Sequence, residues 1–310
     1  MEQKRKVIAL GFFDGVHQGH AALLRRVKER AEELNAIPAA VTFDRHPTAV
    51  IFGKSVPLIN TIQDRAELMR YCYGIEDVVV AHFDENMMRQ PWHDFITEYL
   101  VKEQNACHIV CGHDNRFGYR GEGNPELLKK ACRELGLGCD IIAEVEKDGI
   151  TVSSTYIRKL LEQGDMTRAV AYLGHPHVFT GTVVHGKGLG RAIGIPTANL
   201  IPPDGLLSLA RGVYATAVVL PDQKRYLAVT NVGIRPTVDD GDQVTIEPWI
   251  LDYEGDLYGQ KIRLEFYHYL RGERKFNGLE DLKAEIHRNA DRTRELLGTG
   301  NRMMQLHGEK

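Results

Sequence analysis

Two histidines, His17 and His20, end a stretch that begins at Gly11 and contains two more glycines. The stretch follows an apolar run that predicts a buried strand and precedes apolar residues with helical spacing. A helix N-terminus has unpaired N–H groups and a partial positive charge, which suit a phosphate. Imidazoles three residues apart can point the same way and donate hydrogen bonds to a phosphate that gains charge in a transition state. The pattern favours nucleotide chemistry, while a metal site or a plain surface turn stays open on these residues alone.

Polar residues also follow two later apolar runs. His46 comes after the second run, and Asp114 and Arg116 come after the fourth. Because ligands in open α/β sheets bind beyond the carboxyl ends of the strands, we expect these side chains on the same rim as the two histidines. An arginine there can make two hydrogen bonds to one phosphate. The alternative is that both segments are ordinary solvated loops.

Three consecutive hydroxyl residues start a helical pattern near residue 154, and an arginine follows one turn later. Capping explains one hydroxyl but not three. The helix N-terminus, the hydroxyls and the guanidinium together favour a second phosphate cradle. Its residues are Ser154, Thr155 and Arg158.

The second half of the chain has its own candidate site. A glycine-rich segment at 185–191 can wrap phosphates with backbone amides. Thr197 and Asn199 offer hard oxygen ligands two residues apart, the type that suits Mg²⁺ bound with ATP. The segment contributes Gly186, Lys187, Gly188 and Gly190.

Apolar runs and helical patterns alternate through the first half. Strands are expected at 7–10, 39–43, 78–83, 108–112 and 139–145, with helices between them. Such alternation predicts a parallel sheet covered on both faces.

Beyond residue 174 the alternation stops, and short strands at near-regular spacing predict a small antiparallel barrel. A final helix at 279–297 is expected to bury Leu282, Ile286 and Leu296 against the strands. We place the domain boundaries at 1–174, 175–298 and a polar tail at 299–310. The expected strands are 178–185, 212–220, 225–232, 245–251 and 261–270.

Composition narrows the class of protein. The chain has 310 residues and a net charge of -3, and 43% of its residues are hydrophobic. No long basic run favours nucleic acid, and no apolar stretch approaches the roughly 20 residues of a membrane span. We therefore expect a cytoplasmic protein with small-molecule substrates and no obligate protein partner. Five cysteines form no Cys-x-x-Cys pair, and Cys107, Cys111 and His113 are weak zinc candidates because cysteine in a buried strand acts as a small hydrophobe.

Several motifs carry a family resemblance. The run 11–20 resembles the flavin adenylyltransferase branch of the nucleotidyltransferases, and 152–158 resembles a second element of that superfamily. Pro-Thr-Ala-Asn at 196–199 resembles riboflavin kinases. The whole chain is thus similar to the bifunctional riboflavin kinase/FMN adenylyltransferases, the bacterial FAD synthetase family. The resemblance implies a Rossmann-like doubly wound parallel sheet of nucleotidyltransferase type, followed by a small antiparallel β-barrel with a closing helix of riboflavin kinase type.

The same resemblance implies two reactions and their residues. The second half would phosphorylate riboflavin with ATP and Mg²⁺, with Glu247 as base and Arg271 on the flavin side. The first half would join FMN to AMP from ATP, giving FAD and pyrophosphate, with His17 and His20 stabilising the transferred phosphate. The alternative is a single-activity nucleotidyltransferase with a flavin-binding regulatory module. The resemblance also assigns binding roles to Gly11, Asp14, Gly15, His46, Asp114, Arg116, Ser154, Thr155, Arg158, Gly186, Lys187, Gly188 and Gly190.

Overall fold

The computed structural model describes residues 4–186, 190, 193–236 and 242–298. Their contacts divide the chain into two compact units, each treated by itself below. The first unit contains the chain up to residue 56 together with 65–154. The second contains 57–64 and the described residues from 155 to 298. The boundary expected at residue 174 stays a prediction.

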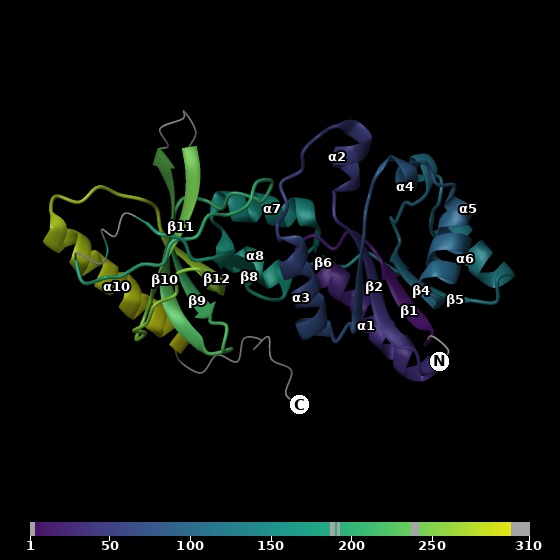
Figure 1. Ribbon diagram of the computed structural model, residues 1–310, viewed down its shortest axis with the longest axis horizontal. Helices are drawn as coiled ribbons and strands as arrows, with labels where there is room; N and C mark the ends of the chain where they lie inside the picture. The colour runs from purple at the N-terminus through teal and green to yellow at the C-terminus, as the bar shows by residue number, and fades with distance from the viewer. Residues whose placement is uncertain (1–3, 187–189, 191–192, 237–241, 299–310) are drawn as a thin grey trace. The chain divides into compact units, whose positions relative to one another are not determined.

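The first unit is built on a five-stranded sheet in the order β3-β2-β1-β4-β5, and every pair of neighbours is parallel. This confirms the expected doubly wound sheet (Figure 1). The order reverses between β1 and β4, and the crevice at such a switch point is where ligands bind. The strands are β1 (Lys6–Leu10), β2 (Ile37–Phe43), β3 (Asp77–Ala81), β4 (Ala106–Gly112) and β5 (Gly138–Ile142).

Helices cover both faces of this sheet. Ile8 and Leu10 pack with Phe95 and Leu128 on one face. Their neighbours in the strand point to the other face, where α1 lies against β1, β2 and β4. The connections hold α1 (Gln18–Leu34), α2 (Pro47–Phe52), α3 (Ile62–Tyr73), α4 (Glu85–Arg89), α5 (Trp92–Asp94), η1 (Phe95–Glu103), η2 (Tyr119–Gly121), α6 (Pro125–Glu134) and the hairpin of β6 (Glu146–Lys147) and β7 (Ile150–Thr151).

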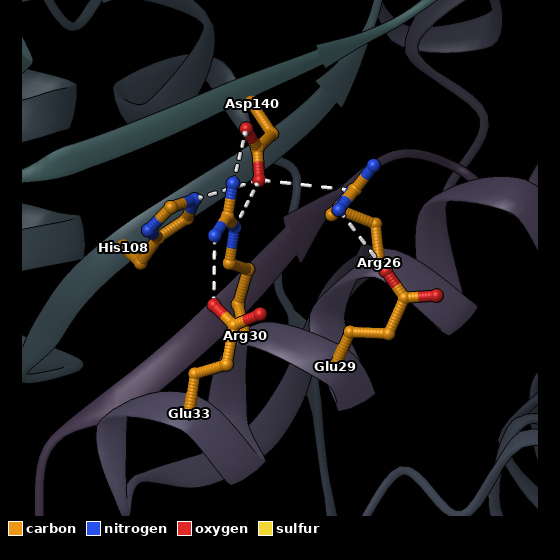
Figure 2. Close-up of polar contacts among 6 residues, drawn as sticks. All are labelled: Arg26, Glu29, Arg30, Glu33, His108 and Asp140. Carbon is orange, nitrogen blue, oxygen red and sulfur yellow. Dashed lines mark hydrogen bonds and ion pairs between the residues drawn. The ribbon is translucent and has the colours of Figure 1, made fainter.

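A polar network fixes α1 to the edge of the sheet (Figure 2). Arg30 Nε donates to Asp140 Oδ2 at 2.7 Å, and His108 Nε2 lies 3.2 Å from the same oxygen. The hydrogen bond from Arg30 is the largest cause of a lowered pKa for Asp140. The network therefore joins the helix that carries His17 and His20 to β4 and β5.

The second unit contains a five-stranded antiparallel sheet in the order β11-β10-β9-β12-β8. The two edges are joined by the segment 198–200, because Asn199 bridges Val184 just after β8 while Leu200 bridges Ile246 of β11. This closure confirms the predicted barrel. Its elements are α7 (Ser154–Gln163), α8 (Met166–Leu173), β8 (His177–Thr182), β9 (Gly212–Val219), β10 (Arg225–Pro236), β11 (Asp242–Ile250), β12 (Lys261–Arg271) and α10 (Leu279–Gly298).

The closing helix is confirmed and buries the predicted face, but the apolar residues predicted there lie at the margin of that face. Leu282, Ile286 and Leu296 are only partly buried. Helix α10 lies beside β9 and β10 (Figure 1), and most of its buried residues are polar. They are Glu285, Asn289, Ala290 and Thr293. A charged residue can lie at the centre of this face because arginines from another segment reach Glu285 and compensate its burial.

Candidate active sites

The loop after β1 has a strained backbone. Phe13 has φ 59° and Val16 has φ 42°, and Gly15 between them has φ 81°. For a residue with a side chain, such a conformation costs about 1–2 kcal/mol. The side chains of Phe13 and Val16 are completely buried, so core packing holds the loop in this shape. Strain of this kind collects at functional sites.

The structure brings His17 and His20 together at the start of α1. His17 is the N-cap, and its Nδ1 accepts a hydrogen bond from the backbone N–H of His20 at 3.3 Å. The rings stack with their centroids 3.6 Å apart. Since Nδ1 of His17 is an acceptor, the ring's proton sits on Nε2. Burial is the largest cause that holds the pKa of His20 well below its usual value, and the charge of Arg65 adds to it. The pair therefore offers neutral hydrogen-bond donors rather than imidazolium charge.

The predicted second cradle reaches this loop through its first hydroxyl. Ser154 Oγ donates to the carbonyl of Asp14 at 2.8 Å. Gly19 packs closely between the two motifs, since a Cβ added to it would lie 3.4 Å from the Val152 carbonyl and 3.1 Å from the His17 ring. Within the first unit, the histidine motif therefore contacts the start of the second motif, up to Ser154. Thr155 and Arg158 belong to the second unit, where Arg158 Nε donates to the Pro57 carbonyl at 2.8 Å.

Arg65 is a residue of this region that the sequence analysis missed. It is completely buried, and its Nη1 donates to the Phe12 and Phe43 carbonyls and to Thr42 Oγ1 at 2.9–3.1 Å. Its guanidinium lies 4.2 Å from the centre of the Phe12 ring, which meets His46 edge-on at 4.6 Å. Burial lowers the pKa of Arg65 to about 10 although Asp14 opposes the shift.

An apolar pocket opens beside the same loop. Its volume is about 480 Å³, and Gly11, Phe12 and Arg116 line it together with aromatic and aliphatic side chains. His46 lies next to Phe12 and caps α2, with its Nδ1 accepting from Thr48 N at 3.2 Å. Asp114 is exposed and is not among the lining residues of this pocket. The pocket has the size and lining of a site for a flat aromatic ligand.

In the second unit, two glycines lie against the predicted magnesium ligands. A Cβ on Gly186 would lie 2.3 Å from Asn199 Nδ2, and one on Gly190 would lie 3.4 Å from Thr197 Oγ1. The sequence prediction that these residues form one site is consistent with this packing. Lys187 and Gly188 lie outside the described residues. Thr197 also lines a pocket of about 320 Å³ formed largely by residues 253–258.

One row of paired residues crosses the barrel wall. Leu200 pairs with Ile246, and Ala198 N donates to the Pro248 carbonyl at 3.0 Å. Antiparallel register therefore places Asn199 opposite Glu247. Glu247 pairs with Asn231, Asn231 with Val213, and Val213 with Arg271. We call these residues the cross-strand row: Asn199, Glu247, Asn231, Val213 and Arg271.

Members of such a row share one face of the sheet. Trp249, two residues from Glu247 and so on the same face, meets His287 of α10 with ring centroids 5.5 Å apart. Helix α10 therefore covers the face that carries the row. Asn231 is identified as a site residue only by its strand pairing, so no sequence motif could have indicated it.

The zinc hypothesis gains no support. Within the described part of the chain, no three His, Cys, Asp or Glu side chains are grouped to hold a metal ion. Cys111 is completely buried, as expected for a small hydrophobe in a strand.

Comparisons with known proteins cover nearly the whole chain. The FAD synthetase family model matches residues 1–156 and the riboflavin kinase model matches 173–297. The chain is 34% identical to the bifunctional riboflavin kinase/FMN adenylyltransferase of Listeria monocytogenes, covering 93% of this chain and 91% of that one. It is also 34% identical to the protein of the same name from Escherichia coli, covering 96% and 94%.

A solved structure shares the architecture. The crystal structure described as a macrolide-efflux protein from Streptococcus pneumoniae matches with a TM-score of 0.83 at 29% identity, covering 95% of both chains. In the described part of this chain, no helix has the length and apolar character to cross a membrane.

Proposed function

The chain belongs to the bifunctional riboflavin kinase/FMN adenylyltransferase family, and on that premise we propose which residues serve each of its two reactions. The family phosphorylates riboflavin to FMN and then transfers AMP from ATP to FMN, which gives FAD. We assign the kinase reaction to the barrel and the adenylyl transfer to the parallel sheet. The cross-strand row is the single observation that carries the assignment of the kinase residues, because it sets Asn199 beside Glu247.

In the kinase reaction a ribityl hydroxyl of riboflavin attacks the γ-phosphorus of ATP, and ADP leaves. Glu247 accepts the hydroxyl proton. Thr197 and Asn199 fit Mg²⁺, since their hydroxyl and amide oxygens are hard ligands and Gly186 leaves the space that the Asn199 amide fills. Bound there, Mg²⁺ would neutralise charge on the transferring phosphates. Gly186 and Gly190 keep the backbone close to the nucleotide, and Arg271 approaches the flavin from the far end of the row.

In the adenylyl transfer an FMN phosphate oxygen attacks the α-phosphorus of ATP and pyrophosphate leaves. No protein nucleophile is required, so catalysis is positioning and electrostatic stabilisation. His17 and His20 donate hydrogen bonds from neutral rings to the phosphate as its charge grows. The pocket beside Phe12 receives the flavin ring, and Arg116 at its wall faces the flavin's polar groups. Triphosphate binding by Ser154, Thr155 and Arg158 stays a prediction of the motif.

Two variants test the assignment. With riboflavin and Mg-ATP, His20→Ala should form FMN and no FAD, whereas Asn199→Ala should form neither from riboflavin and still convert supplied FMN to FAD. Chromatography identifies the products. If the unaltered chain converts supplied FMN to FAD but makes no FMN from riboflavin, the regulatory-module alternative replaces the kinase assignment. Loss of both activities in either variant would contradict separate sites.

A further inference from the structure

The buried face of α10 carries an ionised carboxylate that the proposed mechanism does not use. Glu285 is 8% exposed. Its Oε1 lies 3.2 Å from Arg271 Nε, and its Oε2 lies 2.5 Å from Nη2 of Arg274 and of Arg288. Burial favours a raised pKa for this carboxyl, but the hydrogen bond from Arg288 and the three positive charges hold the pKa below its usual value. A buried charge of this kind persists only when it is paired, as it is here.

Two of the three arginines that meet Glu285, Arg271 and Arg274, lie at the ends of one short segment, 271–274. Arg271 is the last member of the cross-strand row. Glu273, two residues after Arg271, packs against Gly233: a Cβ added to that glycine would lie 3.0 Å from Glu273 Oε1. Gly233 lies on the same strand face as Asn231. The guanidiniums of Arg271 and Arg274 both lie over the Phe276 ring, at 5.6 and 4.9 Å from its centre. The segment therefore lies over the strand face that carries Glu247.

We propose that Glu285 is a positioning residue of the kinase site, whose carboxylate holds the 271–274 segment over the cross-strand row so that Arg271 meets the flavin substrate. The carboxylate acts through Arg271 and touches no substrate itself. The inference rests on the proposed function of the row. It adds a residue of the final helix to a site otherwise made by strands and loops.

The test uses the full-length chain with Glu285→Gln, which keeps the shape of the side chain and removes its charge. We expect KM for riboflavin to rise about tenfold, because the buried ion pair that holds Arg271 is lost. We expect kcat and KM for ATP to change by less than about threefold, since the γ-phosphate site is untouched. Conversion of FMN to FAD in the same sample is the folding control. Glu285→Asp should recover part of the loss.

A matched control lies nearly three turns further along the helix. Glu295 pairs with Arg292 at 2.5 Å, but both side chains are more than half exposed. Glu295→Gln should leave KM for riboflavin unchanged. If Glu285 acts through Arg271, the double variant Arg271→Gln/Glu285→Gln should have the same KM as Arg271→Gln alone.

The outcomes separate the inference from its premise. A KM for riboflavin in Glu285→Gln within twofold of the unaltered chain would overturn the inference, and so would a full additional effect in the Arg271→Gln background. If Glu247→Gln and Arg271→Gln both phosphorylate riboflavin normally, the proposed kinase site itself fails. Normal behaviour of Glu285→Gln while those two variants fail would remove only Glu285.

Discussion

The two sites place their polar groups by different means. His17 and His20 follow a loop whose backbone is left-handed at Phe13, Gly15 and Val16. Asn199 and Glu247 instead owe their approach to β pairing. A strained loop persists only while the surrounding structure holds it, whereas a paired row is fixed by register. The first site should therefore lose activity when the residues that hold its loop are replaced. The second should lose activity when a larger residue crowds the paired row.

The two sites also differ in the charged groups that lie near them. In the first site burial is the main cause of the lowered pKa of His20, and the cation Arg65 is buried behind the loop. In the second, the Arg271 guanidinium is paired with the buried carboxylate of Glu285. The buried cation of the first site is held by carbonyl and hydroxyl acceptors, so removal of Arg65 should lower stability through its lost hydrogen bonds.

Arg65→Met should have the largest effect. The change removes three hydrogen bonds from a buried cation and leaves the carbonyls of Phe12 and Phe43 without that donor. We expect the free energy of unfolding of the first unit to fall by about 3 kcal/mol, with loss of FAD formation. Urea unfolding and the FMN-to-FAD assay measure this. Arg70→Met, on the exposed face of the same helix, should change stability by less than about 0.5 kcal/mol. Unchanged stability in Arg65→Met would show that the loop needs no such support.

Gly186→Ala tests crowding in the second site. The new methyl group would overlap the Asn199 amide, which can only make room by leaving its place opposite Glu247. We expect kcat for riboflavin phosphorylation to fall about a hundredfold, and FMN adenylylation to stay normal. Gly278→Ala is the control, since a Cβ there meets no atom within 4 Å. A fully active Gly186→Ala enzyme would mean that the Asn199 amide need not keep this position.

The sequence predicted the architecture well because both units have strong periodic patterns. Among the residues that the structure describes, the ten strands of the two five-stranded sheets lie where apolar runs predicted them, because burial on a sheet leaves a pattern in the chain itself. Motif spacing also predicted His17, His20, Thr197 and Asn199 as groups. The residue roles remain predictions.

The missed residues depend on tertiary contacts that leave no local pattern. Arg65 in a helix ordinarily suggests a solvated face, and its burial results from carbonyls more than twenty residues away. Glu285 was missed for the same reason, because its partners Arg271 and Arg274 come from the preceding strand and loop. Asn231 needed the strand register, which the sequence does not specify to one residue.

A buried histidine gives the second unit a pH dependence of stability. His177 is 3% exposed, and burial followed by the charge of His175 lowers its pKa to about 3. The unfolded chain then binds more protons between pH 6.5 and 3, so stability is complete above 6.5 and is lost as the pH falls. We expect about 1.5 kcal/mol to be lost between pH 6.5 and 5. His177→Phe should flatten this slope in urea unfolding, while replacement of the exposed His287 should not. An equal slope in His177→Phe would assign the acid sensitivity elsewhere.

The smallest effect should come from the network that fixes α1. The Asp140 side chain is 22% exposed and its partner Arg30 33%, so solvent weakens their attraction. We expect Asp140→Asn to lower the free energy of unfolding by about 1 kcal/mol, and Glu33→Gln, which removes the outer partner of Arg30, by less than about 0.5 kcal/mol. If the first site depends on support alone, FAD formation should fall only in proportion to stability. A loss of FAD formation at full stability would instead show that the placement of α1, and not merely its folding, sets the histidine geometry.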